Sequence, residues 1–278
     1  MKTFHVMTNA DKDPDSKITG RIRDHLAKQG CECSFEILQR DFFDEGYSLP
    51  QGTDCVIVAG GDGTMIQAAD LVGGSVPIIG VNLGTLGFLS EIEVDRLEEM
   101  LDRLIADDFE TEERMMLTGE CGRKMHALND IVISRNGSVK ILNLEIYVND
   151  LLLGVYTADG MIVSTPTGST AYNLSAGGPI VEPSAKTILL SPICPHNLNS
   201  RSIVLSSDDV IRIRIGESSY AEEKSAAATF DGSREITMMP GDSITIRRSF
   251  ISTKLIKPNR ESFLKILSAK LGAKADRL

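Results

Sequence analysis

Residues 54–70 constrain the fold more than any other stretch, because a glycine-rich turn joins two segments of different type. The apolar run at 55–59 predicts a buried parallel strand, and a helix is expected from about Thr64. Between them, Gly60-Gly61-Asp62-Gly63 is typical of turns that direct backbone N–H groups and a helix N-terminus at a phosphate. The carboxylate of Asp62 would repel a phosphate unless it takes part in the chemistry or a metal ion lies between them. The alternative is an ordinary tight turn, where Asp-Gly is common.

A second motif extends from Asp159 to Pro183. A predicted strand at 161–164 leads into a loop and then into a short helix from about Thr170. The loop carries hydroxyl groups that suit a polar, anionic ligand, on Thr165, Thr167, Ser169 and Thr170. This composition alone is more often an ordinary surface loop. Apolar strands on both sides and the sequence Gly177-Gly178-Pro179 favour a loop on a rigid scaffold.

Three segments together resemble the NAD kinase family of bacterial type: 60–64, Asn129-Asp130, and 159–175. The resemblance covers essentially the whole chain, and the segments 80–89 and 230–233 also resemble the family. Diacylglycerol and sphingoid lipid kinases and phosphofructokinases share the first motif, but both motifs at this spacing are highly specific. Two positions depart from the family pattern. Its Asn-Glu pair is Asn129-Asp130 here, and Ser233 stands where a Gln is common.

The resemblance implies an enzyme that phosphorylates the adenosine 2′-hydroxyl of NAD to give NADP. The implied donor is ATP or inorganic polyphosphate, with a divalent metal ion, expected to be Mg²⁺, whose protein ligands the sequence does not identify. A carboxylate in reach of the hydroxyl can take its proton, and the resemblance assigns this role to Asp62. It assigns phosphate and ATP binding to Gly60, Gly61, Gly63 and Thr64. It assigns NAD binding to Asp62, Gly63, Asn129, Asp130, Asp159, Thr170, Ala171, Tyr172, Asn173, Ser175 and Cys194.

Two other classes of function stay open. A lipid kinase shares the first motif but would need a basic or apolar surface facing the membrane. A non-catalytic dinucleotide sensor would have no need of Asp62. The motifs of P-loop enzymes, protein kinases and ordinary dinucleotide-binding dehydrogenases do not occur in the chain. The sequence does not choose between ATP and polyphosphate or between NAD and NADH, and it does not show whether NADP(H) regulates the enzyme.

The net charge and the cysteine content limit the possible partners and the cellular compartment of the protein. The net charge of −10 disfavours nucleic acid and anionic membranes as partners. No apolar run approaches the ~18 residues of a membrane-spanning helix, and the N-terminus lacks the apolar stretch of a signal peptide. The five cysteines, an odd number without C-x-x-C spacing, are typical of reduced thiols. We therefore expect a cytoplasmic protein.

The periodicity of the chain changes near residue 110. Before it, strands alternate with helices, which predicts an α/β domain with a parallel, Rossmann-like sheet. The strands are expected at 3–7, 34–38, 55–59 and 77–81, and the helices at 17–28, from 64, and at 96–106. After it, short alternating strands with hairpin turns at Asn149-Asp150 and Asp231-Gly232 predict an all-β, two-sheet, sandwich-like domain. The first predicted domain consists of 1–110 together with 257–278. The second consists of 111–256 and is expected to bind NAD.

Two helices carry more specific expectations. For the helix at 96–106, Asp95 and Glu98 predict a capping box, and Leu97, Met100, Leu101, Leu104 and Ile105 form one apolar stripe. A C-terminal helix at 260–271 places Phe263, Leu264, Leu267 and Leu271 on one face. The alternative is a simple C-terminal cap, whereas the resemblance implies that this helix returns to the first domain.

The resemblance also implies a homo-oligomer, a dimer or a tetramer. Residues 188–205 combine apolar strands with a proline-containing turn, and we expect the subunits to meet mainly through the β-rich half. The alternative is that both strands are interior strands of a sheet.

Overall fold

The computed structural model describes residues 1–39, 47–84, 87–90, 92–136, 141–196, 200–216, 225–257 and 263–275. The chain forms two compact units. Unit 1 contains Met1–Glu113 and Thr253–Leu278, and unit 2 contains Arg114–Ser252. These ranges differ by a few residues from the expected 1–110 with 257–278 and 111–256. The reason is that β6 (Glu110–Cys121) and β17 (Ser243–Lys257) each continue from one unit into the other without a break.

Unit 1 is built on a parallel sheet. Its strands β1 (Thr3–Asn9), β2 (Glu32–Leu38), β3 (Cys55–Gly60) and β4 (Ile78–Asn82) have the order β2-β1-β3-β4. The short β5 (Ile92–Glu93) and the end of β17 also pair with β4 in parallel. All six residues of β3 are buried, as expected for a parallel strand covered on both faces. The predicted α/β class of this unit is confirmed.

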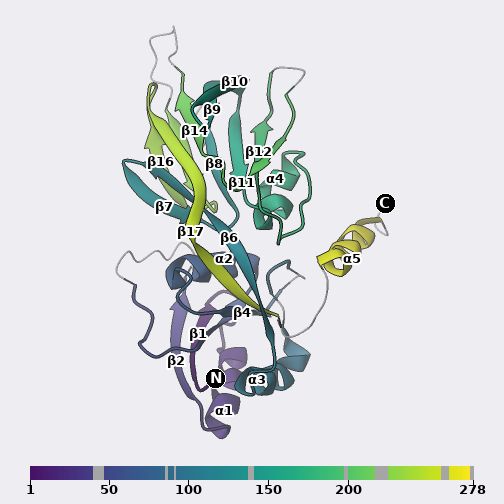
Figure 1. Cartoon of the computed structure of the whole chain (residues 1–278). Helices are drawn as coiled ribbons and strands as arrows, with labels where there is room; N and C mark the ends of the chain where they lie inside the picture. The colour runs from purple at the N-terminus through teal and green to yellow at the C-terminus, as the bar shows by residue number, and fades with distance from the viewer. Residues whose placement is uncertain are drawn as a thin grey trace. The chain divides into compact units, whose positions relative to one another are not determined.

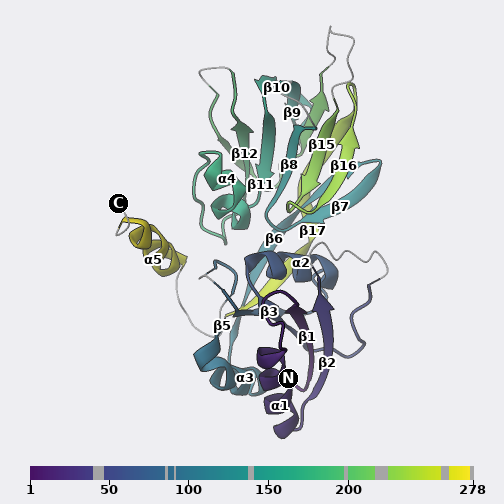
Figure 2. The ribbon, with the colours of Figure 1, turned by 180° about the vertical axis from the view of Figure 1, so that it is seen from behind.

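Helices cover both faces of this sheet. α1 (Lys17–Lys28) and α3 (Leu97–Ile105) lie together on one side of the strands, and α2 (Asp62–Val72) lies on the other, as Figures 1 and 2 show. Ile22 and Leu26 of α1 join the core that the strands form with α3. The predicted stripe of α3 is correct, because Leu97, Met100, Leu101 and Leu104 are buried.

The predicted capping box of α3 is wrong. A 3₁₀ turn, η1 (Val94–Arg96), precedes the helix and takes up Asp95, and the residue at the cap position is Arg96, without a side-chain cap. Glu98 instead accepts two hydrogen bonds from Arg21 of α1, at 2.9 and 2.8 Å. This paired geometry holds α1 and α3 together.

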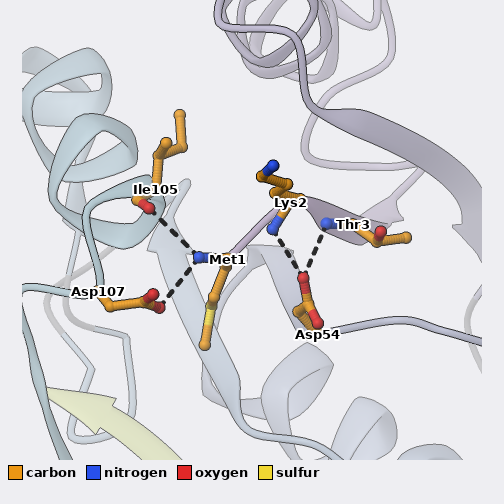
Figure 3. A network of polar contacts seen from close by, with 6 residues as sticks. All are labelled: Met1, Lys2, Thr3, Asp54, Ile105 and Asp107. Atoms are coloured by element: carbon orange, nitrogen blue, oxygen red, sulfur yellow. Dashed lines mark hydrogen bonds and ion pairs between the residues drawn. The ribbon is translucent and has the colours of Figure 1, made fainter.

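A carboxylate also fixes the start of the sheet. Asp54, just before β3, accepts the backbone N–H groups of Lys2 (2.7 Å) and Thr3 (3.0 Å) at the start of β1, as Figure 3 shows. These two bonds lower the pKa of Asp54. In the same region the amino group of Met1 donates to the carbonyl of Ile105 and to Asp107. Both contacts join segments that are far apart in the sequence.

Unit 2 consists of antiparallel strands in two sheets. One has the order β10-β9-β14-β17, with β6 pairing with β17 and β7; the other has the order β13-β12-β11-β8-β15-β16. Buried side chains from both sheets form one core, so the predicted two-sheet β domain is confirmed. The strands are β7 (Arg123–Ala127), β8 (Asp130–Arg135), β9 (Leu142–Val148), β10 (Leu151–Ala158), β11 (Gly160–Ser164), β12 (Thr187–Ile193), β13 (Ile203–Ser206), β14 (Ile211–Ile215), β15 (Ala226–Phe230) and β16 (Arg234–Met238).

Both predicted hairpin turns form. Asn149 and Asp150 have φ values of 49° and 64° between β9 and β10, as a two-residue turn with both central residues left-handed requires. Asp231 and Gly232 have φ values of 50° and 71° between β15 and β16.

Two expectations about apolar segments hold only in part. Ile188, Leu189 and Leu190 of β12 are buried in unit 2, so the first strand of 188–205 is interior. The second strand, β13, lies at the end of its sheet and exposes Val204 (52%), and 197–199 lie outside the described residues. The C-terminal helix α5 (Phe263–Ala275) is present and belongs to unit 1, but Leu264 is 68% exposed and does not share a buried face. Residues 260–262 of the expected helix and the side chain of Leu271 lie outside the described part. None of the described helices is long and apolar enough to cross a membrane.

Candidate functional site

The glycine-rich turn connects β3 to α2 and places Asp62 at the first residue of the helix. The half-buried carboxylate of Asp62 accepts the backbone N–H groups of Phe88 (2.8 Å) and Leu89 (3.1 Å). Gly87 permits this contact, because a Cβ atom at that position would collide with the carboxylate. A carboxylate offers about four lone-pair positions, so two remain for a substrate hydroxyl. The segment 80–89 therefore orients Asp62, although residues 85 and 86 lie outside the described part.

Thr64 holds the turn together from within. Its side chain is 5% exposed, and its hydroxyl oxygen accepts the N–H of Gly61 at 3.4 Å. A Cβ atom at Gly60 would collide with the same side chain. The hydroxyl of Thr64 and the N–H of Gly61 are thus engaged inside the protein. The first-turn N–H groups of Asp62, Gly63 and Thr64, for which a helix has no carbonyl partners, are the groups of this turn that can receive a phosphate, and Gly63 is exposed.

In unit 2, one carboxylate organises the Asn129-Asp130 segment. Asp231 accepts the backbone N–H groups of Leu128 (2.7 Å), Asn129 (2.7 Å) and Asp130 (3.2 Å), and its own N–H donates to the carbonyl of Asp130. The sequence predicted a hairpin turn at Asp231 and a family resemblance of 230–233, but not these contacts, since the partners of Asp231 lie more than a hundred residues away. In the same turn, the hydroxyl of Ser233 donates to the carbonyl of Phe230.

The buried carboxyl of Asp130 is the most perturbed acid of unit 2 among the described residues. Burial, and then the nearby charge of Asp231, raise its pKa to about 7. The side chain is 5% exposed. A carboxyl group with this pKa changes its charge near neutral pH, which is typical of residues that bind or react.

The loop after β11 is tied to the same segment. The hydroxyl of Thr165 donates to the carbonyl of Leu128 (2.7 Å), and its N–H donates to the carbonyl of Asn129 (2.8 Å). Thr167 and Ser169 are also buried, and Ser169 donates to the carbonyl of Val181. The expectation that the loop hydroxyls form a cluster of ligand donors is therefore wrong for Thr165 and Ser169, whose hydroxyls are used to fold the loop. Thr170, which is half-buried, keeps the exposure that a ligand contact needs.

The loop ends in a 3₁₀ turn, η2 (Thr167–Thr170), and a short helix, α4 (Tyr172–Ser175), follows. The residues from Ala171 onward differ in what they can contact. Tyr172 is 47% exposed, Ser175 is exposed and Ala171 is half-buried, so all three are accessible to a ligand. Asn173 is fully buried. Its amide donates to the carbonyls of Ser169 and Pro179 and accepts from the hydroxyl of Ser191. Asn173 can therefore support this site but cannot offer its side chain to a ligand in this arrangement.

Asp159 and Cys194 lie close together at one end of β11 and β12. The N–H of Asp159 donates to the carbonyl of Ile193 at 3.0 Å, and the exposed Cys194 follows with a φ of 43°. The carboxylate of Asp159 lies 3.6 Å from the guanidinium of Arg135. The structure thus groups the unit 2 residues into two neighbourhoods, one around Asn129 and 165–175 and one around Asp159.

The comparisons with known proteins identify the class of the protein. Residues 16–109 match the family model of the ATP-NAD kinase N-terminal domain, and residues 128–258 match that of the C-terminal domain. The NAD kinase of Lachnospira eligens is 44% identical over 293 residues, which cover 98% of this chain and all of the relative. That of Agathobacter rectalis is 44% identical over 283 residues, covering 98% and 99% of the two chains.

Two solved structures have the same fold. Yeast NADH kinase in complex with NADH has a TM-score of 0.85 at 26% identity, covering 98% of this chain and 88% of the yeast chain. An NAD kinase from Archaeoglobus fulgidus in complex with ATP has a TM-score of 0.79 at 24% identity, covering 95% and 99%. The chain is thus a phosphotransferase of the two-domain α/β and β type. It belongs to the NAD kinase family, and its activity is the phosphorylation of NAD.

The raised pKa of Asp130 makes stability depend on pH. Because the folded pKa of about 7 lies above the ordinary 3.8, folding takes up a proton between these values, and stability falls as pH rises through that window. Asp130→Asn removes the buried charge and keeps the shape. We expect it to raise the thermal unfolding midpoint at pH 8 and to give a smaller gain at pH 5, measured by calorimetry.

Asp208→Asn is the matched control, because Asp208 is an exposed carboxylate of the same unit that pairs with Arg248. It should change the midpoint little at either pH. An Asp130→Asn variant that is less stable than the wild type at pH 8 would show that the carboxylate is held ionised by partners rather than destabilised by burial.

Proposed function

We propose that Asp62 is the general base of the phosphoryl transfer and that residues of unit 2 bind NAD. The 2′-hydroxyl oxygen of the adenosine ribose attacks the terminal phosphorus of ATP, the bond to the bridging oxygen breaks, ADP leaves, and the hydroxyl proton passes to Asp62. The observation that supports this role is the pair of N–H bonds from Phe88 and Leu89, which fix the carboxylate and leave it free to accept a proton. Phosphoryl transfer asks mainly for positioning and charge compensation.

On the acceptor side, we assign the carboxylate of Asp130 to the ribose hydroxyls and the exposed ring of Tyr172 to stacking on a base. Asn129, Asp159, Thr170, Ala171, Ser175 and Cys194 complete the proposed NAD site. Asn173 supports the loop from within. The proposed donor contacts are the N–H groups of Asp62, Gly63 and Thr64, while Gly60 and Gly61 shape the turn.

The metal-ligating side chains of the described residues limit how this chain can hold a divalent ion. Among the described residues, no three His, Cys, Asp or Glu side chains gather into a metal-binding group. Mg²⁺ usually keeps several waters and is bound through one or two carboxylates and the substrate phosphates. We propose that Mg²⁺ enters with the donor phosphates, where it would offset their charge.

The chemical roles can be tested by assaying NADP formation from NAD, ATP and Mg²⁺. Asp62→Asn keeps the size of the side chain and removes the base. Since general-base catalysis contributes on the order of 10²- to 10⁴-fold, we expect kcat to fall at least 10²-fold while NAD still binds. Near-normal turnover of this variant would remove Asp62 from the role of base.

Tyr172→Ala tests the NAD site in the same assay. It should raise the KM for NAD and leave the KM for ATP nearly unchanged, because only the acceptor base loses its stacking partner. A variant that loses ATP affinity alone would mean that the two nucleotide sites are assigned the wrong way round.

We also propose a cytoplasmic homo-oligomer. All five cysteines are free, which agrees with a reducing compartment. β10 lies at one end of its sheet and exposes Leu151 (75%), Leu152 (57%), Leu153 (43%) and Val155 (53%). An apolar edge strand needs a cover, and a second copy of the chain through unit 2 is the partner that closed symmetry favours.

Light scattering tests this assembly. At micromolar concentration the wild type should have at least twice the chain mass of 30.2 kDa. Val155→Lys, which places a charge on the exposed edge, should shift the mass toward that of one chain without unfolding unit 2. A fully active wild-type monomer at that concentration would contradict the proposal.

A further inference from the structure

A lysine that the sequence motifs do not include lies over the glycine-rich turn. Lys12 belongs to the loop after β1, and its Nζ approaches the turn so closely that a Cβ atom at Gly61 would be 2.5 Å from it. A Cβ atom at Gly84, in the loop after β4, would be 3.3 Å from the same Nζ. The ammonium group therefore lies where the loops after β1, β3 and β4 meet, at the carboxyl ends of three adjacent parallel strands. This edge of an open α/β sheet is where ligands usually bind.

The loop that carries Lys12 is braced on both sides. The side-chain carbonyl of Asn9 accepts the N–H groups of Asp11 (3.0 Å) and Lys12 (3.1 Å), and its amide donates to Thr64 of the turn at 3.4 Å. Asp13 accepts the N–H groups of Ile18 (3.1 Å) and Thr19 (2.8 Å) at the start of α1. The backbone on either side of Lys12 is thus fixed to α1 and to the turn. The exposed side chain of Lys12 therefore extends from a fixed position of the backbone.

Apart from Lys12, the charges around the glycine-rich turn are unfavourable for binding a phosphate donor. No lysine or arginine occurs between Arg40 and Arg96, although this stretch contains the turn, α2 and the loop after β4. Asp62 adds a negative charge to the turn. Within the described part of the chain, no carboxylate forms an ion pair with Lys12. The fold therefore brings a cation from the loop after β1 to a turn that has none of its own.

We propose that Lys12 is a donor-binding residue, whose ammonium group contacts the terminal phosphates of the phosphoryl donor beside Gly61. This inference rests on the proposed function and adds to it a specific cation for the donor. An ammonium group suits a phosphate as a compact point charge with three N–H donors. Backbone N–H groups of α2 and the charge of Lys12 then act on the same phosphates, so the turn can bind a polyanion in spite of Asp62.

The test is a calorimetric titration with ATP, inorganic tripolyphosphate and AMP, using the wild type, Lys12→Met and Lys12→Arg. Lys12→Met should lose about 10- to 100-fold in affinity for ATP and for tripolyphosphate, the range expected for one contact between charged groups. AMP, which lacks the outer phosphates, should bind both proteins equally. Lys12→Arg should recover most of the lost affinity, because it keeps the charge.

Lys28→Met is the matched control. Lys28 is exposed in the last turn of α1, about 16.5 Å along the helix axis from its first residue, and its loss changes the net charge by the same amount. This variant should bind all three ligands as the wild type does. Equal weakening by Lys12→Met and Lys28→Met would mean that only the overall charge matters, which would overturn the inference.

Two further outcomes would also overturn it: a folded Lys12→Met variant that binds tripolyphosphate as tightly as the wild type, or a wild type that does not bind tripolyphosphate. In steady-state kinetics the same variant should raise the KM for ATP and leave the KM for NAD unchanged. The titration needs no turnover. A wild type that binds tripolyphosphate through Lys12 but makes no NADP would reject the proposed function and leave the role of Lys12 standing.

Discussion

The acceptance of backbone N–H groups by aspartate carboxylates is the interaction on which both halves of this protein depend. Asp231 holds the main chain at Leu128–Asp130 by three such bonds. Asp62 is held by the N–H groups of Phe88 and Leu89, and Asp54 and Asp13 fix the starts of β1 and α1 in the same way. Each carboxylate satisfies donors that would otherwise be unpaired in a turn or at a strand end. Loops that carry function are thereby fixed to a rigid scaffold.

This use of carboxylates explains how an acidic chain can bind polyanionic nucleotides. Charges that accept two or three N–H groups are partly compensated by the main chain, so a net charge of −10 overstates the repulsion that a phosphate meets at the turn. Asp130 is different, since burial beside Asp231 raises its pKa to about 7. Asp62 and Asp130, assigned to proton transfer and to the ribose hydroxyls, are thus held in different environments. One is fixed by N–H donors, and the other is buried with little compensation.

The sequence predicted those features that local pattern determines. The parallel strands, the strand-turn-helix around Asp62, the hairpin at Asn149-Asp150 and the stripe of α3 follow from periodicity and turn chemistry. Residue spacing could not show the contact of Asp231 with Leu128, or the approach of the Lys12 side chain to Gly61, because each joins separate segments through the fold. It also could not show that Thr165 and Asn173 direct their polar groups inward. A hydroxyl or amide looks the same in a sequence whether it binds a ligand or the backbone.

The most direct test of this account is the KM for NAD of Asp231→Asn. The substituted amide keeps the size of the side chain, loses the charge, and turns an N–H₂ group toward backbone donors. If Asp231 positions the acceptor segment, the KM for NAD should rise by about tenfold or more, the loss expected for hydrogen bonds to a charged group, while the KM for ATP stays nearly the same. A folded variant with an unchanged KM for NAD would contradict the central claim that these carboxylate contacts form the site.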